Sequence, residues 1–266
     1  MNTDLIHLFE ELGGEFVSPS SSLIEKWGKI KAIVFDWDGV FNTGIKGHET
    51  TSHFTEADSM GVNMLRFSSW LKTRSQLKTA IITGQKNASA LHFAKREHFD
   101  MIYMGKANKS TAFHDLHTSL GLKPEEIMYV FDDVLDLPVA ELAGLRIMVN
   151  RYASPLFYHH VKSNGLADYI SFNEGGENAV REVCELLIGI NGNYSEVMQK
   201  RSDSTGSWNI IDNLRGDDNY LSANSSNAEG SMTASSFHLT STGFTLDNSF
   251  SEWNASGGTY IYLAIA

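Results

Sequence analysis

The sequence predicts an α/β fold, a Rossmann-like parallel sheet within residues 29–191, followed by a small β-rich segment at the C-terminus. Short apolar runs alternate with segments of helical period, which is the pattern of parallel strands joined by crossover helices. Each apolar run closes on polar or glycine residues. The composition changes after Lys200, beyond which the chain has no Lys and no Pro and becomes dense in Ser, Asn, Thr and Gly.

Five apolar runs predict buried strands, because each is rich in Ile, Val, Met or aromatic residues and ends at a turn or an acid. The helical segments between them begin near residues that can act as N-caps, namely Asp58 or Ser59, Asn87 and Ser110. The predicted strands are KAIVFDWD (31–38), TAIITG (79–84), DMIYMG (100–105), IMYVFDD (127–133) and LRIMVN (145–150).

We expect three parts in the chain: an N-terminal helical extension (1–28), the α/β domain (29–203) and the β-rich segment (204–266). Residues 40–56 interrupt the α/β alternation with β-branched and turn residues around Gly44 and Gly47, which predicts a projecting β-hairpin flap. In the last part, FHLTSTGFTLDNSF and GGTYIYLAIA alternate apolar and polar residues as strands do.

Composition argues against several classes of protein. The chain is 42% hydrophobic and 20% charged, as globular proteins are, and its net charge of −11 argues against nonspecific nucleic-acid binding. The N-terminus is acidic, which argues against a secretory signal. The sequence lacks a run of ~18 apolar residues, so we expect no membrane partner. The single cysteine, Cys184, fits a reducing compartment, so we expect a cytoplasmic protein.

Acids gather at two predicted strand ends. Asp36 and Asp38 end the first strand, and Asp132, Asp133 and Asp136 follow a later one. In open sheets of this kind ligands bind at the carboxyl ends of the strands, so these carboxylates can share one pocket. Two carboxylates ~4 Å apart repel by about 4 kcal/mol at an effective dielectric near 20, which calls for protonation or a cation. Oxygen ligands favour a hard ion, and we predict Mg²⁺.

Two other positions can hold phosphate oxygens. Thr83 and Gly84 end a third strand and offer a hydroxyl with nearby backbone N–H groups. Lys109 adds positive charge beside a helix N-terminus, which already favours anions. Along the chain, the strand ends and a helix start therefore carry an acid, a hydroxyl, a lysine and an acid pair, in that order. This order points to phosphoryl chemistry.

Four segments resemble the motifs of haloacid dehalogenase (HAD)-type phosphatases: DWDGV, ITG, Lys109 in GKANKSTAF, and FDDVLDLPVAE. The flap, HFTEADSMGV and GGENAVREVCELL are similar to the 3-deoxy-manno-octulosonate 8-phosphate phosphatase group and its relatives that act on nine-carbon sugar-acid phosphates. The spacing from Asp38 to Thr83 and on to Lys109 leaves no room for a cap domain, so we expect a capless HAD-like core.

The resemblance implies a role for each motif residue. Asp36 is expected to attack phosphorus and form an aspartyl-phosphate, while Asp38 protonates the leaving oxygen and then activates water. Thr83 and Lys109 are expected to hold the phosphoryl oxygens. The expected magnesium ligands are the Asp36 carboxylate, the Asp38 carbonyl, Asp132 and Asp133, and Asp136 is expected to support Lys109 or the metal loop.

The substrate implied is a small sugar-acid phosphate. The chain departs from the group at a few positions, and Gln85, Glu56 and Ala57 lie where recognition of the sugar is expected. The group often has Ser or Thr followed by Asp where this chain has Asn42-Thr43. It often has Arg in place of Gln85 and Gly in place of Phe131. Asp58 can be a helix N-cap or a substrate contact, and both readings stay open. The expected substrate-binding residues are Gly39, Asp58, Gly84, Gln85, Gly175 and Gly176. Relatives close their open pockets by assembling, which implies a homo-oligomer, usually a tetramer.

The last 63 residues resemble the closing strands of phage-tail or virion-type β-sandwich modules, on TGFTLDNSFSEWNASGGTYIYLAIA. Two alternatives to the sugar-acid phosphatase therefore stay open. The same chemistry can serve another small phosphorylated metabolite, or the chain can be a virion or surface attachment protein that keeps the phosphatase core as a scaffold.

Overall fold

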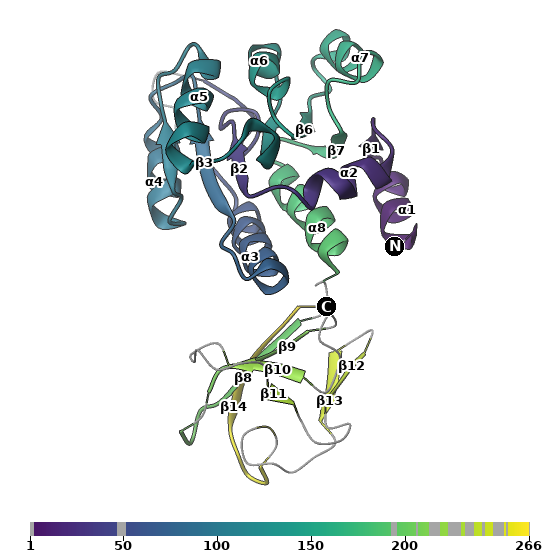
Figure 1. The fold of residues 1–266 in the computed structure, drawn as a ribbon, viewed down its shortest axis with the longest axis vertical. Helices are drawn as coiled ribbons and strands as arrows, with labels where there is room; N and C mark the ends of the chain where they lie inside the picture. The colour runs from purple at the N-terminus through teal and green to yellow at the C-terminus, as the bar shows by residue number, and fades with distance from the viewer. Residues whose placement is uncertain are drawn as a thin grey trace. The chain divides into compact units, whose positions relative to one another are not determined.

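The computed structural model describes residues 3–46, 52–192, 196–205, 207–212, 219–222, 230–231, 237–240, 243–246, 253 and 255–265. The chain forms two compact units, 1–190 and 191–266 (Figure 1). The boundary that we expected near residue 203 lies inside the second unit. Strand β8 (Glu196–Arg201) pairs with two strands of that unit, although its composition resembles that of the first.

The first unit is built on a seven-stranded sheet of order β1-β7-β6-β5-β2-β3-β4, parallel throughout except for antiparallel β1. All five predicted strands are present, whereas β7 and the two-residue β1 were not predicted. The N-terminal extension therefore adds an edge strand to the sheet as well as helices. The strands are β1 (Glu15–Phe16), β2 (Ala32–Phe35), β3 (Lys78–Ile82), β4 (Met101–Tyr103), β5 (Ile127–Phe131), β6 (Leu145–Asn150) and β7 (Tyr169–Glu174).

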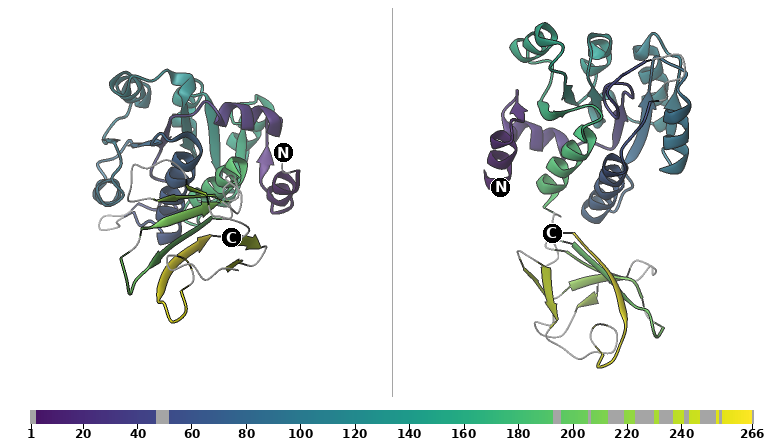
Figure 2. Two further views of the ribbon diagram at one scale, coloured as in Figure 1. Left: turned by 60° about the horizontal axis from the view of Figure 1, so that its bottom comes forward. Right: turned by 180° about the vertical axis from the view of Figure 1, so that it is seen from behind.

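Helices cover both faces of this sheet and bury one hydrophobic core on each (Figures 1 and 2). Side chains alternate along a strand, so in β2 Ile33 and Phe35 enter one core while Ala32 and Val34 enter the other. α1, α2, α3, α4 and α8 pack in the first core, and α5, α6 and α7 in the second. The helices are α1 (Thr3–Glu11), α2 (Ser20–Trp27), α3 (Glu56–Thr73), α4 (Ala88–Arg96), α5 (Lys109–Leu120), α6 (Leu137–Ala140), α7 (Pro155–Ser163) and α8 (Ala179–Asn191).

Two of the expected helix starts lie elsewhere. Thr55 caps α3 through a hydrogen bond from the Asp58 N–H, so Asp58 and Ser59 are inside the helix. Asn108 caps α5, which makes Lys109 its first residue and places Ser110 inside. Asn87 caps α4 as expected.

The expected flap is described in part. In residues 40–46 and 52–55 the backbone forms turns and irregular segments, with one isolated bridge between Asp38 and Asn42. Residues 47–51, Gly47 among them, lie outside the described residues. In the part of the chain that is described, no helix is both long and apolar enough to cross a membrane.

The second unit is β-rich, as expected. A five-stranded antiparallel sheet has the order β11-β10-β9-β8-β14, and β12 pairs with β13. Ile211, Phe237 and Trp253 form a small core. Besides β8, the strands are β9 (Asn209–Asp212), β10 (Asn219–Ser222), β11 (Gly230–Ser231), β12 (Phe237–Thr240), β13 (Gly243–Leu246) and β14 (Tyr260–Ile265).

A buried carboxylate, Asp168, ties the N-terminal segment to the amino ends of the strands. It accepts hydrogen bonds from Lys26 Nζ at 2.6 Å and from the Arg146 backbone N–H at 2.9 Å, and Arg146 Nη2 lies 3.1 Å away. Its backbone carbonyl also accepts from Val17 N–H at 3.0 Å. Burial alone would raise the pKa of Asp168, but Arg146 and Lys26 outweigh burial and the pKa lies below its ordinary value.

We predict that Asp168→Asn lowers the free energy of unfolding by about 3 kcal/mol at neutral pH, because it removes a fully buried carboxylate from two half-buried cations, Lys26 and Arg146. A carboxyl group with a lowered pKa stabilises the fold above its ordinary pKa of ~3.9, and this contribution is lost as the pH falls below it. The difference between the two proteins should therefore shrink in acid. Urea unfolding followed by helical circular dichroism measures it. Glu25→Gln, which removes the exposed pair with Lys29, is the control and should change nothing. Equal stability of Asp168→Asn and the unmodified chain would contradict the assignment.

Candidate active site

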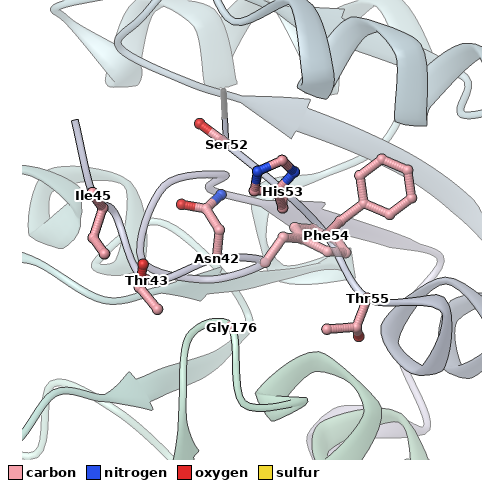
Figure 3. Close-up of a pocket in the computed structure, with 9 residues that line it drawn as sticks. Asn42, Thr43, Ile45, Ser52, His53, Phe54, Thr55 and Gly176 are labelled. Carbon is pink, nitrogen blue, oxygen red and sulfur yellow. The ribbon is translucent and has the colours of Figure 1, made fainter. Parts of the chain in front are cut away.

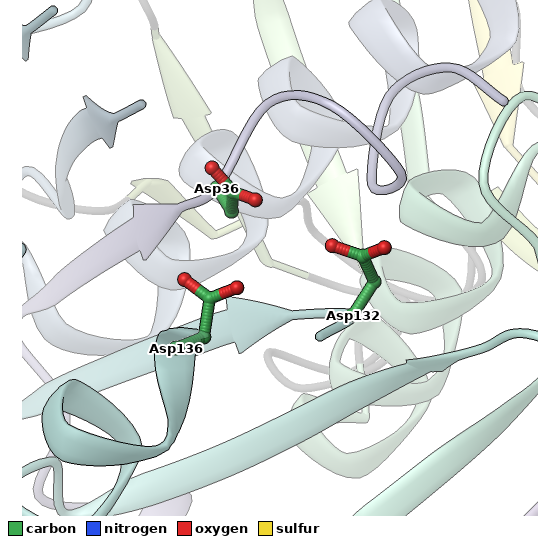
Figure 4. Close-up of side chains that lie close together, drawn as sticks. All are labelled: Asp36, Asp132 and Asp136. Atoms are coloured by element: carbon green, nitrogen blue, oxygen red, sulfur yellow. The ribbon is translucent and has the colours of Figure 1, made fainter. Parts of the chain in front are cut away.

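Three buried carboxylates meet at the carboxyl ends of two neighbouring strands. Asp36 follows β2 and Asp132 follows β5, and these strands are hydrogen-bonded neighbours in the sheet. Asp136 ends the 3₁₀ turn Val134–Asp136 just beyond β5. One carboxylate oxygen from each of the three lies within 4.8 Å of the others (Figure 4). The structure therefore brings together Asp36 and Asp132, as expected from the sequence.

Lys109 joins this cluster from the first turn of α5. Its ammonium lies 2.8 Å from Asp36 Oδ1 and 2.6 Å from Asp136 Oδ1. The hydroxyl of Tyr129, inside β5, also donates to Asp136 Oδ1. Asp136 thus holds Lys109 against Asp36, and Tyr129 holds Asp136.

The cluster carries more negative charge than Lys109 can balance. Burial, followed by the Asp136 carboxylate, raises the pKa of Asp36 to about 7, against the lowering effect of Lys109. Burial, followed by the Asp36 carboxylate, raises the pKa of Asp132 to about 8. Burial alone would lower the pKa of Lys109, but Asp36 and Asp136 outweigh it and raise that pKa. A further cation would favour the ionised form of both raised carboxyl groups.

The donor set fits a magnesium ion. Asp132 Oδ2 is buried and accepts no hydrogen bond, although Arg151 Nη2 lies 3.1 Å from it as an ion pair. Carboxylate oxygens are the ligands that hard divalent cations prefer, and the three acids of the cluster supply them. Asp133 lies outside the cluster of three. Its side chain is 47% exposed, and one oxygen accepts from the Val134 N–H while the other lies 3.5 Å from Arg151 Nη1.

The Asp38 side chain contacts the flap and is not part of the cluster of three acids. Its Oδ1 accepts from Ser52 Oγ at 2.9 Å and from Asn87 Nδ2 at 3.4 Å, and its Oδ2 pairs with Lys46. Lys46, Ser52 and Asn87 were not predicted as site residues. Their positions in the sequence carry no shared spacing that would have indicated them.

Thr83 lies at the end of β3, next to the strand that carries Asp36. It is buried, its N–H donates to the Tyr103 carbonyl at 2.8 Å, and its Oγ1 accepts from the Gln85 N–H at 3.4 Å. Gly84 and Gln85 follow it and are exposed. These three residues therefore form an open edge beside the acids.

The glycines expected at the substrate site allow close backbone approaches. Gly39 has a φ of +89°, and a Cβ there would lie 2.0 Å from Asp132 Oδ2. A Cβ on Gly175 would lie 2.0 Å from the Gly39 carbonyl oxygen, so the loop after β7 closes directly on the turn after β2. Glu182 holds the end of β7, just before this loop, by accepting from the N–H groups of Phe172 at 3.0 Å and Asn173 at 2.9 Å.

Asp58, the other expected substrate contact, has no exposed surface. Its Oδ1 accepts from the Arg181 N–H at 2.8 Å and its Oδ2 from Thr55 Oγ1 at 2.9 Å, which ties α3 to α8. Burial, opposed by these hydrogen bonds, raises the pKa of Asp58. In this structure Asp58 is a buried support at the start of α3 and offers no surface to a ligand.

A cavity of about 240 Å³ lies between the described part of the flap and the loop that carries Gly176 (Figure 3). Ser52, His53 and Phe54 come from one arm of the flap, and Asn42 and Thr43 lie opposite them. Gly176 is the one expected substrate-binding residue among those that line this cavity: Phe41, Asn42, Thr43, Ile45, Ser52, His53, Phe54, Thr55 and Gly176.

Comparison with known proteins separates the two units. Residues 190–266 match the family model "Domain of unknown function (DUF7483)". The chain is 33% identical over 181 residues to the 3-deoxy-D-manno-octulosonate 8-phosphate phosphatase KdsC of Escherichia coli (strain K12), a match that covers 66% of this chain and 89% of that protein. The resemblance of the second unit to virion-type modules stays a prediction.

Solved structures resemble the first unit. The 3-deoxy-D-manno-octulosonate 8-phosphate phosphatase of Yersinia pestis matches with a TM-score of 0.54 and 28% identity, over 64% of this chain and 87% of that one. The enzyme of the same name from Moraxella catarrhalis, solved with magnesium, phosphate and KDO, matches with a TM-score of 0.53 and 30% identity, over 65% of this chain and 93% of that one.

We predict that Asp132→Asn stabilises the metal-free protein and removes the gain in stability that Mg²⁺ gives to the unmodified chain. A carboxyl group whose pKa is raised to about 8 costs stability that grows as the pH rises from its ordinary value of ~3.9, so the gain from Asn should be larger at pH ~8 than at pH ~5. For the unmodified chain, Mg²⁺ at a hundred times its Kd should add about 2.7 kcal/mol.

Thermal melts with EDTA and with Mg²⁺ measure both effects. Asp100→Asn, which changes a carboxylate that binds the Thr79 N–H at the amino end of β3, is the control and should keep the response to Mg²⁺. A response to Mg²⁺ that survives in Asp132→Asn would contradict the assignment.

Proposed function

The chain belongs to the 3-deoxy-D-manno-octulosonate 8-phosphate phosphatase family of HAD-type phosphomonoester hydrolases, and from this membership we propose that it hydrolyses a small sugar-acid phosphate through an aspartyl-phosphate. The observation that carries the proposal is the placement of Asp36, buried at the end of β2 with the Lys109 ammonium 2.8 Å from its Oδ1. The substrate proposed first is 3-deoxy-D-manno-octulosonate 8-phosphate or a related nine-carbon sugar-acid 9-phosphate.

Asp36 acts as the nucleophile in this proposal. A carboxylate oxygen of Asp36 forms a bond to phosphorus while the bond from phosphorus to the sugar oxygen breaks, and Asp38 gives its proton to that oxygen. Water then attacks the aspartyl-phosphate, Asp38 takes the proton from the water, and phosphate leaves with Asp36 restored. Lys109 favours the ionised form of Asp36 that the first step needs.

Lys109 and Thr83 hold the phosphoryl oxygens during both displacements, because phosphoryl transfer depends mainly on positioning and on compensation of charge. Lys109 lies beside Asp36 at the start of α5, and Thr83 lies at the end of β3, next to β2. Asp136 orients Lys109, and Tyr129 keeps Asp136 in place.

Asp36, the Asp38 carbonyl and Asp132 are proposed to hold Mg²⁺, with Asp133 binding it directly or through water. The bound ion would neutralise charge on the phosphoryl oxygens. Support comes from the clustering of buried carboxylate oxygens and from the raised pKa values of Asp36 and Asp132 in the metal-free protein.

Gly39, Gly84, Gln85, Gly175 and Gly176 are proposed to contact the substrate. Gly39 lies against Asp132, the Gly175–Gly176 loop lies against the turn after β2, and Gly84 and Gln85 follow β3, the neighbour of β2. Gln85 stands where the family often has Arg, so a different small phosphorylated metabolite is the alternative substrate. A panel of phosphate esters, assayed for phosphate release, separates the two.

We predict that Asp36→Asn lowers kcat by at least ~10⁴-fold with every ester that the chain accepts, since the amide is not a nucleophile. Phosphate release is measured with Mg²⁺ and then with EDTA, which should stop it. Asp100→Asn removes a carboxylate at the amino ends of the strands and should retain activity. Full activity in Asp36→Asn would refute the mechanism.

A homo-oligomer, a tetramer as the family resemblance implies, is proposed to cover the open pocket. Large apolar side chains are exposed on the segments that follow β5 and β6, the strands that lead into Asp132 and Arg151. Leu135 is 76% exposed, Tyr152 72% and Leu156 85%. Surface apolar groups gathered around a functional edge are typical of an association site.

Sedimentation equilibrium should therefore give a mass that is a multiple of the 29.5 kDa chain. Leu135→Asp should shift the population to smaller species, because a charge would be buried in the contact. Leu8→Asp, on α1 and 50% exposed, is the matched control and should leave the mass unchanged. A monomer for the unmodified chain at micromolar concentration would contradict the proposal.

A further inference from the structure

The Asp38 carboxylate is held by side chains that belong to none of the four phosphatase motifs. Asn87 Nδ2 donates to Ser52 Oγ at 2.6 Å and lies 3.4 Å from Asp38 Oδ1, and Ser52 Oγ donates to the same Oδ1 at 2.9 Å. The three residues come from α4, the flap and the turn after β2. They form one hydrogen-bonded network that ends on Asp38 Oδ1.

The orientation of the Asn87 amide is determined by the helix that it caps. Its Oδ1 accepts from the Ser89 N–H at 3.0 Å and from the Ala90 N–H at 3.2 Å. A flipped amide would point N–H groups at these two donors, so the NH₂ group must face Ser52 and Asp38. The start of α4 therefore aims a donor at the carboxylate.

Ser52, a flap residue, is buried and links the Asn87 amide to Asp38. The Ser52 hydroxyl accepts a hydrogen bond from the Asn87 amide and donates its single proton to Asp38 Oδ1. Both donors reach the same oxygen. The other oxygen, Oδ2, pairs with Lys46, whose side chain is 52% exposed. Oδ2 is thus the oxygen of Asp38 whose partner lies toward solvent.

We propose that Asn87 is a positioning residue for Asp38, acting directly and through Ser52 to fix the carboxylate so that Oδ2 faces the leaving oxygen. This inference rests on the proposed function, in which Asp38 protonates the leaving group. Its chemical consequence is specific. A misplaced proton donor slows the hydrolysis of esters whose leaving oxygen needs the proton. It has little effect on the hydrolysis of esters whose leaving oxygen departs without one.

Asn87→Ser separates this role from helix capping, because Ser and Asn are equally good N-caps while Ser lacks the amide N–H groups. The full chain is assayed with phenyl phosphate and p-nitrophenyl phosphate, which have similar size and charge but differ in how much the leaving oxygen needs a proton. The quantity compared is kcat/KM, because it covers the steps up to departure of the alcohol and excludes later hydrolysis of the aspartyl-phosphate.

We expect Asn87→Ser to lower kcat/KM by about tenfold or more for phenyl phosphate and by less than about threefold for p-nitrophenyl phosphate. Ser52→Ala should shift the same ratio in the same direction, and serves if Asn87→Ser folds poorly. Asn63→Ser is the matched control, since the Asn63 amide donates to the Glu97 carboxylate at 2.6 Å, and it should leave the ratio unchanged.

Equal losses for the two esters, or no loss with either, in both Asn87→Ser and Ser52→Ala would overturn this inference and leave the proposed function standing. If the unmodified chain with Mg²⁺ hydrolyses neither ester and no sugar phosphate, the proposed function fails and this inference fails with it. The two failures are therefore distinguishable.

Discussion

The mutual repulsion of Asp36, Asp132 and Asp136 is the constraint on which the rest of the site depends. Their oxygens lie within 4.8 Å of one another in a buried place, where each pair of charges repels by several kcal/mol. Lys109 offsets part of this cost from α5, and Arg151 offsets part of it at Asp132 Oδ2, a buried oxygen that accepts no hydrogen bond. Because β2 and β5 are neighbours in the sheet, Asp36 and Asp132 lie close together and repel each other. The same arrangement brings together the groups that the proposed reaction uses.

The sequence predicted the acids because they follow apolar strands, and Lys109 because it stands at a helix start, where side-chain type alone indicates a ligand site. Asp136 was expected to support Lys109 or the metal loop, and its carboxylate lies 2.6 Å from the Lys109 ammonium. The prediction failed where position depends on contacts between distant segments. Asn87 was predicted as a helix cap, which is correct, but its donors to Asp38 and Ser52 depend on how the flap folds back.

The fold shows the same division between local and distant causes. Long apolar runs predicted β2 to β6, whereas β1 has two residues and exists through its pairing with β7. The change of composition after Lys200 suggested a boundary there, but β8 pairs with β14, some 60 residues later in the chain, and so belongs to the second unit. Composition reports the local sequence, and strand pairing over such a distance leaves no local signal.

The central claim is that phosphate passes through a covalent bond to Asp36, and stereochemistry at phosphorus tests it most directly. Hydrolysis of an ester made chiral at phosphorus with oxygen isotopes, carried out by the full chain with Mg²⁺, should give phosphate with retained configuration. Two successive in-line displacements each invert phosphorus, first by Asp36 and then by water. Inversion overall would mean that water attacks the ester directly, and it would contradict the account.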